Sequence, residues 1–208
     1  MSILNQLASA RERSDEVPNQ LLAKTIAASD DKTAVQELVD NLANKNKDIQ
    51  SDCIKVLYEI GAIQPQLIAG YVDTFVGLLT SRNNRLVWGA MTALGAVAAV
   101  ETKTISKHVD VIIQATDKGS VITQDWGIRV LATLSAKDQT AAKKIAPFLT
   151  QFLQDCPAKD MPRHAESIFP ALNSSNKKPI LDVLENRLPD LKPPQTKRVN
   201  NLIKQIKN

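Results

Sequence analysis

Few side chains in this sequence stand at spacings that support catalysis. The two histidines, His108 and His164, fall in different predicted helices, and a packing or surface role at a helix end explains each of them. The two cysteines, Cys53 and Cys156, lie far apart, which provides neither metal-ligand spacing nor a disulfide framework. No glycine-rich phosphate loop is present. The sequence therefore predicts no catalytic residue, no metal site and no cofactor.

A second group of residues has the types and the spacing of a binding surface. Its members recur every three or four residues along predicted helices and again 37 residues later, and they are Lys107, Val111, Gln114, Lys118, Lys144, Phe148 and Gln151. An exposed Phe beside cations suits a protein or peptide ligand. The alternative interpretation is that these Lys and Gln side chains only keep the surface solvated.

The elements that must position these residues are paired helices. Small residues recur at intervals of 37 or 38, each followed four residues later by a large apolar residue: Cys53 and Leu57, Ala90 and Leu94, Gly127 and Leu131, Ala165 and Phe169. A second series recurs at intervals of 37 and consists of Ala34, Tyr71, His108 and Ile145. Self-similarity at a period of about 20 to 50 residues is typical of repeat arrays. The helical phase buries Leu94 between repeats and places Lys55 on an exposed side.

This period predicts an all-α solenoid of about five helical pairs that forms one domain, residues 1–208. We expect an N-terminal cap helix at 1–16, helical pairs at 17–44, 46–81, 83–118, 121–155 and 162–191, and a C-terminal cap helix at 195–208. Pro170, inside the apolar series, predicts a kinked or shortened helix. No sustained period-two alternation favours β structure.

Composition limits the function classes further. The formal net charge of +4 is too small to indicate nucleic-acid binding by itself. The sequence has no span of about 18 apolar residues and no secretory leader at its start. We therefore expect a cytoplasmic protein that does not enter a membrane.

Two stretches of the sequence resemble HEAT repeats. Residues 87–95 (VWGAMTALG) are similar to the first helix of such a repeat, and residues 145–153 (IAPFLTQFL) to the second. The Arg that usually follows the first-helix Val is matched only at Arg163. The same position in the other repeats holds Ser51, Trp88 and Asp125. The resemblance covers residues 17–191. It implies a right-handed α–α superhelix with first helices outside and second helices lining a concave surface that binds another macromolecule.

Two functions remain open on this evidence. The favoured one is a non-catalytic module that binds a protein or peptide on the concave surface. The alternative is a DNA-binding protein that resembles the HEAT-like alkylpurine DNA glycosylases, because Asp125, Trp126 and Arg129 supply the residue types of their cleft. We favour the first, because these three residues are expected on an outward-facing helix and because duplex binding requires many distributed cations. The oligomeric state stays open.

Overall fold

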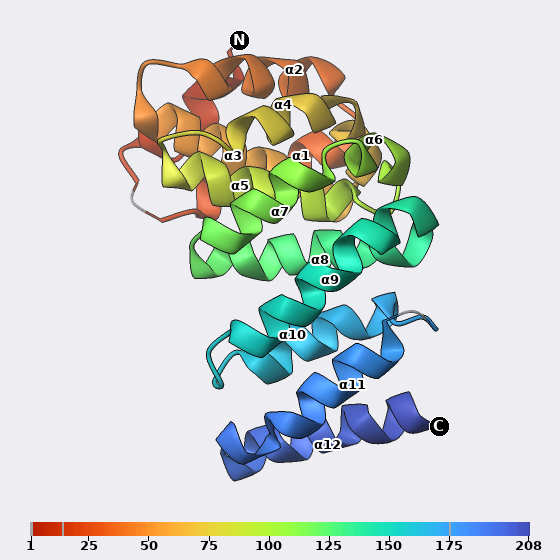
Figure 1. The fold of residues 1–208 in the computed structure, drawn as a ribbon. Coiled ribbons are helices and arrows are strands. Elements are labelled where there is room, and N and C mark those ends of the chain that lie inside the picture. The colour runs from red at the N-terminus through yellow and green to blue at the C-terminus, as the bar shows by residue number, and fades with distance from the viewer. Residues whose placement is uncertain (1, 14, 175) are drawn as a thin grey trace.

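Helices form wherever the apolar spacing repeats. The computed structural model describes residues 2–13, 15–174 and 176–208, and this part of the chain contains no strand (Figure 1). Met1 and Ser14 of the predicted segment 1–16, and Ser175 of the predicted segment 162–191, lie outside the described residues. The all-α solenoid expected from the 37-residue period is confirmed.

The helices alternate between two layers. The first helices of successive pairs are α1 (Val17–Ser29), α3 (Lys47–Ile63), α5 (Asn84–Val97), α8 (Val121–Lys137) and α10 (Met161–Ile168). The second helices are α2 (Lys32–Asp40), α4 (Val72–Leu78), α7 (Val109–Lys118), α9 (Gln139–Asp155) and α11 (Lys177–Asn186). A short helix, α6 (Thr102–Ser106), precedes α7, and α12 (Pro193–Lys207) closes the described chain.

The ends of the chain differ in detail from the prediction. The N-terminal segment forms two 3-10 helices, η1 (Ile3–Gln6) and η2 (Ser9–Arg11), where one cap helix was expected. The last helix begins two residues before the predicted start, because Pro193 lacks an amide hydrogen and fits the first helical turn. The expected effect of Pro170 is present, since α10 gives way to a 3-10 helix at residues Phe169–Ala171.

Polar residues in the turns mark where α3, α5, α8 and α9 begin. The side chains of Asn46, Asn83 and Ser120 accept backbone hydrogen bonds from the first turns of α3, α5 and α8, and Asp138 does the same for α9. Such caps satisfy amide hydrogens that have no partner within the helix. Local sequence therefore sets the phase in which each helix presents its side chains.

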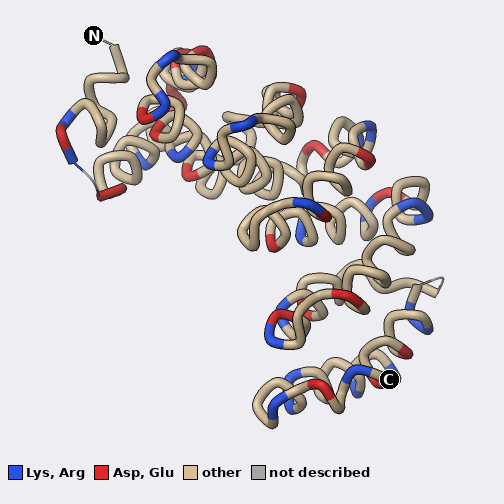
Figure 2. The backbone as a smooth tube through the Cα atoms, turned by 60° about the vertical axis from the view of Figure 1, so that its left-hand side comes forward, with Lys and Arg blue, Asp and Glu red and all other residues tan. Residues whose placement is uncertain are grey.

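The stack of helices bends so that the first helices lie on its inner side. Figure 1 shows the second helices as one layer in front of the first helices. In the view of Figure 2 the chain curves from the N-terminus to the C-terminus, and the first helices follow the inside of that curve. The resemblance to HEAT repeats implied the opposite placement, with the second helices inside. That expectation is wrong.

Small residues in the first helices explain this curvature. A Cβ atom at Gly89 of α5 would lie 2.6 Å from the side chain of Ile54 on α3, and one at Gly95 would lie 2.6 Å from the Trp126 ring on α8. The first helices therefore pack directly on one another from α1 to α8, whereas α2, α4 and α7 make few direct contacts among themselves. The more closely packed layer of a two-layer stack takes the inner side of its bend.

The core follows the contact between the two layers and runs the length of the stack. Leu94 is fully buried in it, as the sequence predicts. Among the helices of the described residues, none has the length and apolar character needed to span a bilayer.

Candidate partner-binding surface

The inner side of the bend carries aromatic and charged side chains on four consecutive first helices. Several of them contact one another across neighbouring first helices. We call this set the inner-face cluster, and it consists of Lys55, Tyr58 and Glu59 on α3, Arg85 and Trp88 on α5, Asp125, Trp126 and Arg129 on α8, and Arg163 on α10. The spacing of three or four residues along each helix brings them to one side.

Lys55 occupies the most buried position of the cluster. Its side chain is 7% exposed, and its Nζ lies 2.6 Å from Oε1 of Glu59 and 2.9 Å from Oε2 of Glu16. The ammonium group also lies 4.9 Å from the centroid of the Tyr58 ring. Burial disfavours the charge, but the hydrogen bonds to the two carboxylates outweigh burial and raise the pKa of Lys55. The predicted exposure of Lys55 is therefore wrong.

The reason is Glu16, which precedes α1 and reaches over the start of the inner face. Its carboxylate bridges Lys55 of α3 and Arg85 of α5. Burial alone would raise the pKa of Glu16, but hydrogen bonds from Lys55 and Arg85 lower it below its usual range. The Arg85 guanidinium lies 4.6 Å from the Trp88 ring, and the Trp88 ring lies 5.8 Å from that of Tyr58. The N-terminal segment thus covers part of this face with its own carboxylate.

Trp126 and Arg129 form a second aromatic and cationic pair further along the stack. The guanidinium carbon of Arg129 lies 4.9 Å from the Trp126 ring, which in turn packs on Gly95 of the preceding first helix. Arg129 is exposed, and its guanidinium group makes no ion pair or hydrogen bond with any described residue, whereas its backbone carbonyl accepts a hydrogen bond from Thr133. Its donors are therefore directed to solvent.

Asp125 links α8 to α10. Its Oδ1 lies 2.9 Å from Nη2 of Arg163, which also contacts Asp160 at 3.1 Å. The imidazole of His164 is 3% exposed and lies 3.7 Å from Asp125, and its burial lowers its pKa. The arrangement holds two neighbouring repeats together and leaves Asp125 already paired with a cation.

The seven residues singled out from the sequence lie on the outer layer. Lys107 directly follows α6, three others lie on α7, and Lys144, Phe148 and Gln151 lie on α9. Lys144 is paired with Asp110 at 2.6 Å, and the half-buried Phe148 packs on Phe152 with ring centroids 5.9 Å apart.

Five of these seven residues line two separate hollows. One hollow of about 300 Å³ is lined by Val111, Gln114 and Lys118, and a separate hollow of about 220 Å³ by Phe148 and Gln151. Their role in partner binding stays a prediction.

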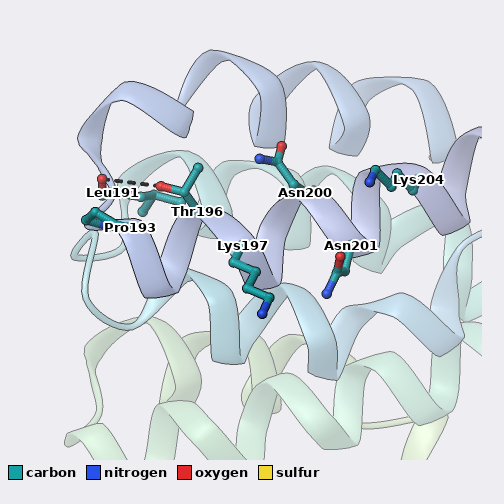
Figure 3. Close-up of a pocket in the computed structure, with 7 residues that line it drawn as sticks. All are labelled: Leu191, Pro193, Thr196, Lys197, Asn200, Asn201 and Lys204. Atoms are coloured by element: carbon teal, nitrogen blue, oxygen red, sulfur yellow. Dashed lines mark hydrogen bonds between the residues drawn. The ribbon is translucent and has the colours of Figure 1, made fainter.

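A third hollow, of about 610 Å³, lies along α12 at the C-terminal end. Lys197 and Asn201 extend from the same side of the helix, and Asn200 lies on the other (Figure 3). Lys197 and Lys204 form no ion pair with any residue that the structure describes. This end of the stack therefore presents uncompensated positive charge, in line with the blue segments at the C-terminal end in Figure 2.

No metal centre is apparent, because the described residues contain no group of three or more His, Cys, Asp and Glu side chains placed to hold an ion. Sequence reasoning named Asp125, Trp126 and Arg129 but not the rest of the inner-face cluster, because it assigned the first helices to the outside. The small residues Gly89 and Gly95 were the available signal, since they permit the close helix contacts of an inner layer.

Comparison with known proteins supports the fold. No protein-family model matches the chain, and no curated protein matches it. Among solved structures, an engineered protein aligns with a TM-score of 0.70 and 20% identity over 100% of this chain and 97% of its own. A computationally designed armadillo repeat protein for modular peptide recognition aligns with a TM-score of 0.68 and 17% identity, over 98% and 90% of the two chains. A designed armadillo repeat protein in complex with the peptide (KR)4 aligns with a TM-score of 0.69 and 15% identity over the whole of both chains. The chain therefore has a HEAT/armadillo-like α-solenoid fold, as the sequence resemblance implied.

Proposed function

We propose that this protein is a non-catalytic interaction module that binds a segment of a protein or peptide along the inner face of its solenoid. The observation that carries the proposal is the inner-face cluster, in which Trp88 and Trp126 are only half-buried and each stacks with an Arg. Tyr, Trp and Arg are the residue types most enriched at the energetic centres of protein interfaces. One solenoid of similar fold was designed for modular peptide recognition and another is in complex with the peptide (KR)4, which supports the same class of partner.

The ordered state of the cluster supports binding further. Trp126 rests on Gly95 and Trp88 lies beside Tyr58, so neither ring needs to be immobilised when a partner binds. Preorganisation lowers the entropy cost of association. An extended segment that lies across α3, α5 and α8 would meet one aromatic ring per first helix.

Duplex DNA is the second candidate, because Asp125, Trp126 and Arg129 lie on the inner side rather than on the outer side expected from the sequence. Duplex affinity depends on neutralising many phosphates. Arg85 and Arg163 are each already paired with carboxylates of this chain. Arg129 is then the one Arg of the described inner-face cluster that could bind a phosphate. We therefore favour a protein or peptide as the partner.

A random peptide library selected on the full chain tests the proposal. Synthetic versions of the selected peptides are measured by fluorescence polarisation against wild type, Trp126→Ala and Phe148→Ala. We expect Trp126→Ala to weaken binding about tenfold or more and Phe148→Ala to have little effect. If Phe148→Ala alone weakens binding, the outer layer is the binding surface.

The same assay with a duplex of about 20 base pairs addresses the second candidate. Tight duplex binding that falls steeply with salt would favour DNA over a peptide. If all selected peptides bind Trp126→Ala as tightly as Phe148→Ala, the assignment of binding to the inner face is refuted.

A further inference from the structure

The inner-face cluster contains Arg side chains on α5, α8 and α10, and those on α5 and α10 already bind carboxylates of this chain. Arg85 is paired with Glu16, and Arg163 with Asp125 and Asp160. On α12, Arg198 donates two hydrogen bonds to Glu166, at 2.8 and 2.6 Å. Three of the four Arg side chains on α5, α8, α10 and α12 are therefore paired with a carboxylate of this chain.

Arg129 is the one of these four Arg side chains that is not paired with a described carboxylate. It stacks on Trp126, and no carboxylate pairs with it within residues 2–13, 15–174 and 176–208. Stacking on an aromatic ring leaves the N–H groups at the edge of a guanidinium free, and their fork matches the two oxygens of a carboxylate. The Arg129 guanidinium is therefore held in place by the Trp126 ring, and its N–H groups face solvent.

The position equivalent to Arg129 at the N-terminal end of the stack is paired with a carboxylate. Lys55, Thr92 and Arg129 occupy the same helical position in three consecutive first helices, at intervals of 37 residues. At the first of these positions, Glu16 arrives from a segment outside the repeats and pairs with Lys55 beside the Tyr58 ring. At this position a cation next to an aromatic ring is thus paired with a carboxylate from outside the repeats, in addition to Glu59 of its own helix.

An exposed apolar side chain lies near Arg129, and α12 carries further cations that are unpaired among the described residues. Ile122, two turns before it on α8, is 45% exposed and provides an apolar contact on the same side of the helix. Beyond α10, Lys197 and Lys204 add positive charge that no described carboxylate offsets. Arg129 on α8 and Lys197 and Lys204 on α12 are therefore cations without a paired carboxylate among the described residues.

Resting on the proposed function, we infer that the partner is an acidic segment, and that Arg129 binds one of its carboxylates while Trp126 and Ile122 contact an apolar neighbour. Glu16 occupies the equivalent position at the N-terminal end and acts as an internal copy of the ligand. This preference is opposite in charge to the (KR)4 peptide held by the designed armadillo repeat protein.

The test compares three labelled octapeptides, (Asp-Glu)4, (Lys-Arg)4 and (Asn-Gln)4, by fluorescence polarisation with the full chain at about 50 and 300 mM salt. We expect (Asp-Glu)4 to bind about tenfold or more tightly than (Lys-Arg)4, and Arg129→Gln to weaken it about five- to tenfold. Arg82→Gln is the matched control, because Arg82 is exposed in the turn before α5 and makes the same change of charge. It should change binding less than twofold.

Glu16→Gln is expected to tighten peptide binding, a gain that misfolding of the variant would not produce. It releases Arg85 and leaves Lys55 paired with Glu59, so we expect tighter binding of (Asp-Glu)4, by about threefold or more. Circular dichroism confirms that each variant is folded.

Several results would overturn the inference. They are tighter binding of (Lys-Arg)4, equal effects of Arg129→Gln and Arg82→Gln, or no saturable binding of (Asp-Glu)4 at the lower salt concentration. Binding of (Lys-Arg)4 that Trp126→Ala abolishes would leave the proposed function standing while the acidic preference fails. The proposed function itself fails if the library-selected peptides bind wild type and Trp126→Ala equally well.

Discussion

Replacing Lys55 with Met should destabilise the protein strongly, although the helical phase alone predicts a nearly silent substitution. The side chain of Lys55 is 7% exposed and contacts two carboxylates, one from its own helix and one from the segment before α1. Met keeps the aliphatic stem beside Tyr58 and removes only the charge. The substitution therefore isolates the electrostatic contribution.

The expected magnitude follows from burial. Removing one partner of a buried ion pair costs about 3–5 kcal/mol, because it leaves an uncompensated charge. Here the side chains of Glu16 and Glu59 keep 40% and 29% exposure, so water solvates them in part, and Arg85 still neutralises Glu16. We expect a loss of about 2–4 kcal/mol in the free energy of unfolding.

Urea unfolding followed by circular dichroism measures this loss. Lys47→Met is the control, because Lys47 is exposed at the first turn of the same helix and should change stability by less than about 0.5 kcal/mol. A double-mutant cycle with Glu59→Gln should show coupling of about 0.5–3 kcal/mol. Equal unfolding midpoints for Lys55→Met and Lys47→Met would refute the reasoning.

The same ion pairs predict how stability depends on pH. The pKa of Glu16 is lowered in the folded state, so its contribution is present above the pKa of the unfolded chain and is lost as pH falls through the folded value. The pKa of Lys55 is raised, so its contribution persists up to about pH 10 and is lost at higher pH. We expect Lys55→Met to lose less stability relative to wild type below about pH 4 than at pH 7.

Three further substitutions or deletions test the packing. Leu94→Ala should cost about 2–5 kcal/mol in thermal or urea unfolding, because Leu94 is fully buried between repeats. Gly95→Ala should cost about 1–3 kcal/mol and shift tryptophan fluorescence, since its Cβ would displace the Trp126 ring, whereas Gly77→Ala, with open space around it, should stabilise slightly. Deleting α12 should expose the apolar side of α11 and cause self-association in size-exclusion chromatography, and a monomeric, equally stable truncation would contradict its capping role.

The sequence was sufficient to predict the repeating architecture. The 37-residue interval between Cys53, Ala90 and Gly127 identifies paired helices, and polar caps such as Asn83 and Ser120 mark where they begin. Both signals are local or strictly periodic, so they can be read without knowing what lies across the chain. The burial of Leu94 follows from the same periodicity.

Only the tertiary structure decided which layer lies inside the bend and therefore which side chains share a surface. Both layers repeat with the same period, so the period cannot distinguish them, and the curvature depends on how closely Gly89 and Gly95 let neighbouring helices approach. The burial of Lys55 likewise depends on Glu16, which arrives from a segment that has no periodicity of its own. Helical phase places a side chain on one side of its own helix, and the contacts across the chain determine whether that side is covered.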